Sequence, residues 1–219
     1  MNRLALVNEL HRECSVAGAG VATTIDQRDE IGRLVGWIDQ AYEQTQSKYF
    51  DWRFLRSSGT FTTQANTNII QAPADLNIWD RERLFDSSLA PQIMTSFDEY
   101  KDGIDVTNTG KPSEFLINAD NTLTALPYPN DTYTYTFSYF KKPDVMTADA
   151  SAPLIPEQFQ RVIIGLAMTM YGNYESAPEI AAQGTQMYQQ YMSGLVANQA
   201  AGERHHYHMA DSHIQVRVV

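Results

Sequence analysis

Apolar residues recur along this chain with two different periods, one typical of helices and one typical of strands. The helical spacing i, i+3, i+4, i+7 runs through 24–49 and returns in 156–174 and 178–195. A shorter amphipathic stretch occupies 4–11. Strict alternation of aromatic and small polar residues fills 131–140, which indicates a β-strand. The pattern therefore predicts a protein that contains both helices and strands.

The alternating strand has two chemically different faces, because successive side chains of a strand point to opposite sides of the sheet. The segment before it, 121–126, ends in a turn at 127–131 that holds two prolines, so we expect a β-hairpin. We expect the helices to pack against the aromatic face. That face carries Tyr133, Tyr135, Phe137 and Tyr139.

We predict an α+β fold in which a helical bundle carries a β-hairpin or small antiparallel sheet as an insertion. The bundle combines a long N-terminal helix with a C-terminal antiparallel helix pair, and an extended C-terminal tail follows. We place the bundle in 1–55 and 153–199, the β-rich insertion in 56–152 and the tail in 200–219. Within the insertion, 73–104 has no clear pattern, although 91–100 could form a short helix.

Local signals refine the helical regions. Thr24 with Gln27 matches a capping box at the start of the long helix. Close to its other end, an aromatic cluster is too dense for a solvated linker, and we interpret it as core. The predicted aromatic core outside the strand is Trp37, Trp52 and Phe54.

Composition narrows the classes of function. The 219 residues carry a formal net charge of -10, which argues against gripping DNA, because that affinity comes chiefly from clustered Lys and Arg. An acidic wall past which DNA slides remains compatible with this charge. Cys14 is the single cysteine, so no intrachain disulfide can form. The start of the chain is too polar for a signal peptide, and no apolar run approaches the roughly 20 residues of a membrane span.

We find no motif that carries chemistry. His11 and Cys14 could suggest a base and a nucleophile, but no orienting group or oxyanion site lies nearby in the sequence. Four histidines between 205 and 213 lack the spacing of a metal site. We therefore expect no enzymatic activity, no cofactor and no metal. One alternative from another class is a carbohydrate-binding module that uses the aromatic face of 131–140, which requires exposed rings.

The end of the chain alternates like a strand and is well suited to adding itself to the sheet edge of a partner protein. We predict that this segment is a docking tail. Its residues are His213, Ile214, Gln215, Val216, Arg217, Val218 and Val219.

Several segments together resemble head-to-tail adaptor (connector) proteins of tailed bacteriophages. The opening of those proteins is similar to Arg33–Ile38 followed by Asp51–Leu55, and their β insertion is similar to the stretch that contains Gly110-Lys111-Pro112 and ends at Tyr139–Pro143. The closing helix pair follows in the expected place. The resemblance extends from about Leu4 to Leu195.

The resemblance implies a structural protein of the virion neck, assembled in the bacterial host cytoplasm as a ring of commonly twelve copies. Such a ring lies below the portal protein, docks on it through the C-terminal tail, and meets a downstream tail or nozzle protein. Genomic DNA passes through its lumen without sequence-specific binding, and no membrane is involved. The alternative within virion proteins is a tail completion or terminator protein, which caps the tail tube instead.

Overall fold

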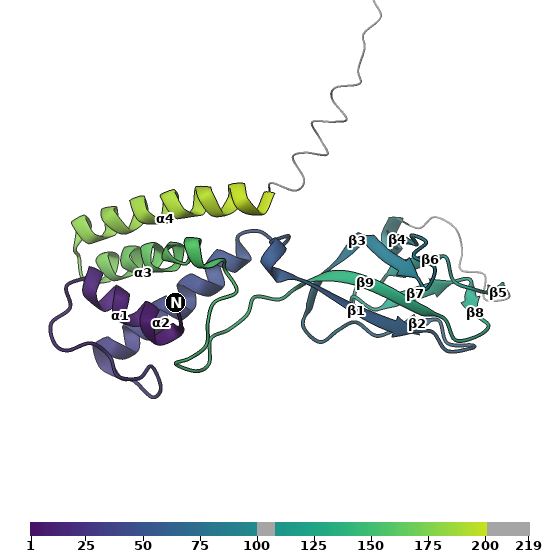
Figure 1. Cartoon of the computed structure of the whole chain (residues 1–219), viewed down its shortest axis with the longest axis horizontal. Coiled ribbons are helices and arrows are strands. Elements are labelled where there is room, and N and C mark those ends of the chain that lie inside the picture. The colour runs from purple at the N-terminus through teal and green to yellow at the C-terminus, as the bar shows by residue number, and fades with distance from the viewer. Residues whose placement is uncertain (100–107, 201–219) are drawn as a thin grey trace, which may run out of the picture. The chain divides into compact units, whose positions relative to one another are not determined.

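The structure, a computed structural model of the chain, describes residues 1–99 and 108–200 (Figure 1). Its helices are α1 (Arg3–Glu13), α2 (Asp29–Ser47), α3 (Arg161–Tyr174) and α4 (Pro178–Ala200), with short 3-10 turns η1 (Arg53–Leu55), η2 (Phe97–Glu99) and η3 (Glu157–Phe159). Its strands are β1 (Arg56–Thr62), β2 (Ile69–Ile70), β3 (Leu76–Asp86), β4 (Ile93–Ser96), β5 (Thr109–Gly110), β6 (Glu114–Ile117), β7 (Leu123–Leu126), β8 (Tyr128–Pro129) and β9 (Thr134–Lys141).

Contacts within the chain divide it into two units. Unit 1 is helical and combines Met1–Phe54 with the chain from Pro143 onward, whereas unit 2 is the β region Leu55–Lys142. Unit 1 therefore needs residues from both sides of unit 2 to complete its core.

The predicted fold class, a helical bundle with a β-hairpin or small sheet inserted, is wrong. The chain is α+β, but its helices are short and its strands form three sheets. The error has a physical source in 73–104, a stretch without a clear hydrophobic period. This region contains the eleven-residue strand β3 and the strand β4, which enlarge the β region into a substantial unit.

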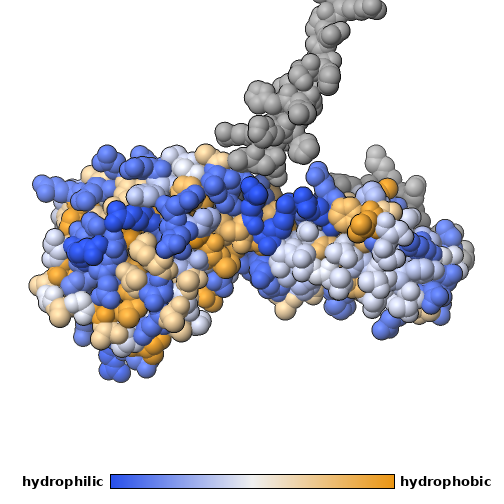
Figure 2. Space-filling view, viewed as in Figure 1, coloured by the Kyte–Doolittle hydropathy of each residue, from blue (hydrophilic) through white to orange (hydrophobic). Residues whose placement is uncertain are grey.

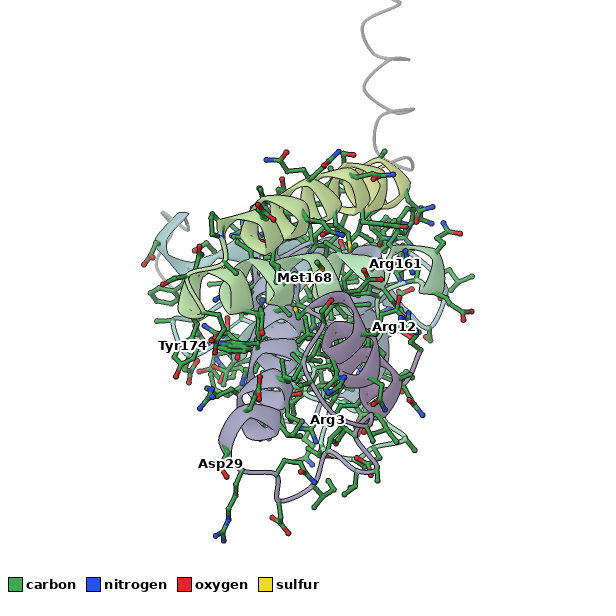
Figure 3. The ribbon with its side chains drawn as sticks, turned by 90° about the vertical axis from the view of Figure 1, so that its left-hand side faces the viewer. Arg3, Arg12, Asp29, Arg161, Met168 and Tyr174 are labelled. Carbon is green, nitrogen blue, oxygen red and sulfur yellow. The ribbon has the colours of Figure 1, made fainter. Side chains whose placement is uncertain are left out.

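The helices of unit 1 form layers in which α3 lies between α4 on one side and α1 with α2 on the other (Figure 3). The middle layer is strongly apolar. Val162, Ile163 and Met168 of α3 are 0% exposed, as are Leu34 and Ile38 of α2. The apolar stripes that the sequence places on these helices thus meet in one core.

The start of α2 differs from the predicted capping box. The helix begins at Asp29, and the residue before it, Arg28, makes no capping hydrogen bond through its side chain. The Thr24 hydroxyl cannot cap this helix because it instead accepts from Arg3 Nη1 at 3.0 Å and donates to Asp149 Oδ1 at 2.5 Å. Asp29 and Glu30 still lie in the first turn, where negative charge stabilises a helix.

The antiparallel pair α3 and α4 packs at very short range because glycines face each other across it. A Cβ atom on Gly184 would lie 2.7 Å from both the carbonyl oxygen of Gly165 and the amide nitrogen of Thr169. A Cβ on Gly172 would lie 2.5 Å from the amide nitrogen of Ala181. Only glycine fits at these backbone contacts, since real Cβ atoms do not approach other atoms so closely.

Unit 2 places its core between two sheets. One sheet has the strand order β1-β9-β3, and the other has the order β2-β7-β6-β4. Their facing side chains form one apolar cluster, to which the two sheets contribute comparable numbers of residues. The cluster consists of Ile70, Leu76, Trp79, Leu84, Met94, Phe115, Leu123, Ala125, Tyr135, Phe137 and Tyr139.

The alternating strand β9 is therefore central, but its partners differ from those predicted. It pairs antiparallel with β1 and β3, whereas β7, its predicted hairpin partner, belongs to the other sheet and pairs with β6 and β2. The predicted packing of helices on its aromatic face is also wrong, because residues from other strands cover that face. A two-sheet core explains both differences, since each sheet needs its apolar face covered.

Filling the glycine contacts of the helix pair should destabilise unit 1. We expect Gly184→Ala to lower the free energy of unfolding by about 1–3 kcal/mol, because the added methyl group must push two backbones apart. The matched control is Gly36→Ala in α2, where nothing lies within 4 Å of the added Cβ. That change should stabilise the chain by about 1 kcal/mol through helix propensity. Denaturant unfolding of both variants measures the difference, and equal effects would contradict the close packing.

Candidate assembly surfaces

The predicted docking tail lies outside the described residues, which end at position 200. This applies to the segment His213–Val219 and to the four histidines between 205 and 213. The tail therefore stays a prediction from the sequence.

The aromatic face of β9 lies within the core of unit 2. Tyr135 is 0% exposed, and its hydroxyl donates to the carbonyl oxygen of Pro112 at 2.7 Å. Phe137 packs its ring over Gly59 on the paired strand, where a Cβ would lie 2.8 Å from the ring. Tyr139 is also buried, and Tyr133 is half-buried. The carbohydrate-binding alternative is therefore wrong, because it requires exposed rings and these rings fill a core.

The other predicted aromatic residues lie in unit 1. Trp52 is buried, donates from Nε1 to the carbonyl oxygen of Gln46 at 3.0 Å, and stacks on Phe54 with ring centroids 5.3 Å apart. Trp37 is half-buried and lies edge-on to Tyr171 at 5.7 Å. Trp37 thus packs the middle of α2 against α3, and Trp52 with Phe54 packs the segment that follows α2.

His11 and Cys14 are both buried. Burial raises the pKa of the Cys14 thiol to about 12, and the nearby Glu13 carboxylate adds to this effect. A thiol with such a pKa stays protonated at neutral pH and is a poor nucleophile. Over 1–99 and 108–200, no cluster of three His, Cys, Asp or Glu side chains could hold a metal ion.

An open groove runs between the end of α2 and the second half of α4. Its volume is about 440 Å³. At its mouth the Lys48 ammonium lies 5.1 Å from the ring centroid of Tyr188 and donates to the Tyr188 hydroxyl at 3.2 Å. The groove is lined by Lys48, Tyr49, Tyr188, Gln189, Met192, Ser193, Val196 and Ala197. Sequence periodicity could not reveal it, because segments that are distant in the sequence line it together.

A second surface of unit 1 is formed by 143–155 and the loop before α2. Asp149 joins these two segments, since its carboxylate accepts from the Thr23 hydroxyl at 2.7 Å and from the Thr24 amide at 2.6 Å. Three large apolar side chains of these segments are exposed, namely Ile25 at 43%, Val145 at 66% and Leu154 at 42%. We call this the Asp149 surface. Apolar patches are visible on the side of unit 1 away from α4 (Figure 2).

Unit 2 also has surfaces that could meet a partner. Strands β2 and β4 are the outer strands of the four-stranded sheet, and each exposes an isoleucine. Ile93 of β4 is 63% exposed and Ile69 of β2 is 43% exposed. Outer strands offer unpaired backbone groups, which makes them natural sites for another chain to add.

Exposed apolar side chains on both units, together with an open groove, are features of proteins that act through contacts with other proteins. They favour the class of proteins that assemble with partners.

A family model described as SU10 adaptor protein matches residues 1–212, and the chain belongs to this family. The match confirms the resemblance to head-to-tail adaptor proteins of bacteriophages that the sequence indicates. No curated protein matches the chain. Among the helices that the structure describes, none is long and apolar enough to cross a membrane.

The stability that Asp149 contributes to the folded chain should depend on pH. Hydrogen bonds from Thr24 and Thr23 hold the pKa of Asp149 below its usual range, and the nearby Arg3 guanidinium contributes. Because the folded pKa is lowered, the stabilisation is complete above the unfolded pKa of about 4 and is lost as the pH falls through the folded value. We expect Asp149→Asn to lower the urea midpoint at pH 7, and the difference from wild type to shrink below about pH 4.

Urea titrations of both proteins between pH 2.5 and pH 7 measure this effect. Asp131→Asn in unit 2 serves as a control, since this exposed carboxylate accepts from the amide of the next residue, Thr132, at 2.7 Å rather than from a distant segment. A difference between Asp149→Asn and wild type that stays constant over this range would contradict the role of the ionised carboxylate.

Proposed function

We propose that this chain is a structural virion protein that forms the head-to-tail adaptor ring of a tailed bacteriophage. In this role, copies of the chain bind the portal protein and extend the DNA channel toward the tail. The observation that carries the proposal is the match of the adaptor family to residues 1–212, because it covers almost the whole chain rather than one motif.

The charge of the chain supports a role as a conduit. A formal net charge of -10 gives a surface that repels the phosphate backbone at short range. DNA that must move quickly through a ring is best served by a wall on which it does not stick. We propose that genomic DNA passes without sequence-specific contacts and that the ring needs neither a cofactor nor an enzymatic activity.

The tail is our candidate for the portal contact. In 213–219 the apolar residues Ile214, Val216 and Val218 alternate with Gln215 and Arg217. An added strand would direct the first three to one face and the other two to the opposite face. Main-chain hydrogen bonds to a sheet edge would supply affinity, and pockets for the three apolar side chains would supply specificity.

The proposed docking predicts a difference between the two faces of the tail. Replacing Ile214, Val216 and Val218 together by Ser should weaken portal binding at least tenfold, because each loses buried apolar area worth roughly 1 kcal/mol or more. Replacing Gln215 and Arg217 by Ser should have a much smaller effect. Pull-down of the purified full chain with portal protein measures both.

Thermal unfolding of the same variants controls for folding. We expect both variants to have the melting temperature of the wild type. A parallel pull-down with tail-tube protein tests the terminator alternative. Retention of the tube protein without the portal protein would overturn the adaptor assignment, and equal portal binding by all three proteins would overturn the docking tail.

A further inference from the structure

Among the helices that the structure describes, α4 differs from the others in the composition of its exposed side. From Ile180 to Ala200 the sequence contains no Asp, Glu, Lys, Arg or His. The chain average of 19% charged residues would place about four in a stretch of this length. The exposed positions are instead Ala182, Gln183, Thr185, Gln186, Gln189, Gln190, Ser193, Ala197 and Asn198.

This composition is unusual for a helix face that meets water. Such faces normally carry charged residues, as α2 does with Arg33 and Glu43, whereas depletion of charge marks the centre of protein contact surfaces. Helix α4 packs mainly on α3, and its other face is open in the single chain (Figure 1). We therefore expect another protein surface to cover this uncharged face.

The uncharged face continues into the groove described above. Ala182, Gln186, Gln189, Ser193 and Ala197 follow one another at helical spacing, and the last three also line the groove beside Tyr49 and Lys48. The floor of the groove includes Met192, which is buried, and Val196, which is half-buried. The surface thus offers an uncharged strip on α4 that adjoins, at one end, a groove with apolar side chains in its floor and Lys48 at its edge.

Charge indicates which partner fits. Two copies of a chain with net charge -10 repel each other, and the repulsion is smallest where at least one of the two contact surfaces carries no charge. A basic partner would gain the most electrostatic binding energy on the acidic faces of the chain and none on the uncharged face of α4. We propose that the uncharged face of α4 and the adjoining groove form the contact with a second copy of this chain.

The opposite side of unit 1 supplies the complementary surface. In Figure 1, α4 forms one side of unit 1 and 143–155 lies on the other. The Asp149 surface exposes Val145 and Leu154 there, and either side chain is small enough for the groove. Contact between two different surfaces of identical chains is head-to-tail, which closes into a ring when the rotation between copies allows it. This inference rests on the proposed ring function.

Photocrosslinking tests the contact. The full chain is prepared with p-benzoylphenylalanine at position 186, as an equal mixture of nitrogen-14 and nitrogen-15 copies, and is assembled into particles before irradiation. We expect mixed-isotope dimers in which position 186 is joined to the peptide that contains 143–155. The control places the same photoreactive residue at position 40, an exposed glutamine of α2, and should yield at least tenfold less of this product.

A charge test accompanies it. Gln186→Glu with Gln189→Glu adds two like charges without changing side-chain size, so we expect incorporation into particles to fall at least tenfold while the melting temperature stays within about 2 °C of wild type. The matched control, Gln40→Glu with Gln44→Glu in α2, should assemble normally. Normal assembly of the α4 variant would overturn the inference.

The outcomes also separate this inference from the proposed function. If the chain is present in particles but position 186 joins portal or tail protein, or joins nothing, the α4 contact is wrong and the adaptor function stands. If the chain is absent from particles and does not bind portal protein, yet position 186 joins 143–155 of another copy in solution, the adaptor function is wrong and the contact stands.

Discussion

The helical unit depends on one buried amide that joins two distant parts of the chain. Gln46 of α2 is 1% exposed, and its side chain donates from Nε2 to the carbonyl oxygen of Asp144 and accepts from the Asp144 amide through Oε1, both at 2.9 Å. The amide thus satisfies both backbone groups of a residue 98 positions away. Loss of this pair would leave two partly buried backbone groups without their protein partner, at a cost of up to about 1–3 kcal/mol for each.

The Tyr42 hydroxyl strengthens the same connection. It donates to the carboxylate of Asp144 at 3.2 Å and accepts from the amide of Leu154 at 2.9 Å, and burial raises its pKa above the ordinary value. These bonds hold 143–155 against α2 where the chain returns from the β region. They also set the position of the Asp149 surface, so the second surface of the proposed ring contact depends on them.

The sequence predicts the helices better than the sheets, and the reason is physical. A helix buries a stripe of residues that its own periodicity reveals. Buried positions of α2, α3 and α4, such as Ile38, Val162 and Leu195, can therefore be inferred from the sequence. The order of strands depends on pairings between distant segments, which periodicity does not encode. Strand β3 is the extreme case. A register shift between Trp79 and Leu84 and exposed polar residues between them hide its alternation.

The surfaces are still less visible in the sequence. The groove beside Tyr188 lies between α4 and the residues Lys48 and Tyr49 that follow α2, and the bonds of Thr24 to Asp149 replace a capping box that the local sequence favours. The absence of charge from 180–200 is visible in the sequence. It indicates a contact surface only because the structure leaves one face of α4 uncovered. Contact surfaces can be located only from the tertiary structure, and the kind of partner is then inferred from the charge and shape of each surface.

Electron microscopy of portal protein incubated with the purified full chain tests the central claim most directly. The adaptor account predicts a closed ring of this chain on the axis of the portal, with a channel continuous through both. A portal without added density, or a ring found only at the end of tail tubes, would contradict it.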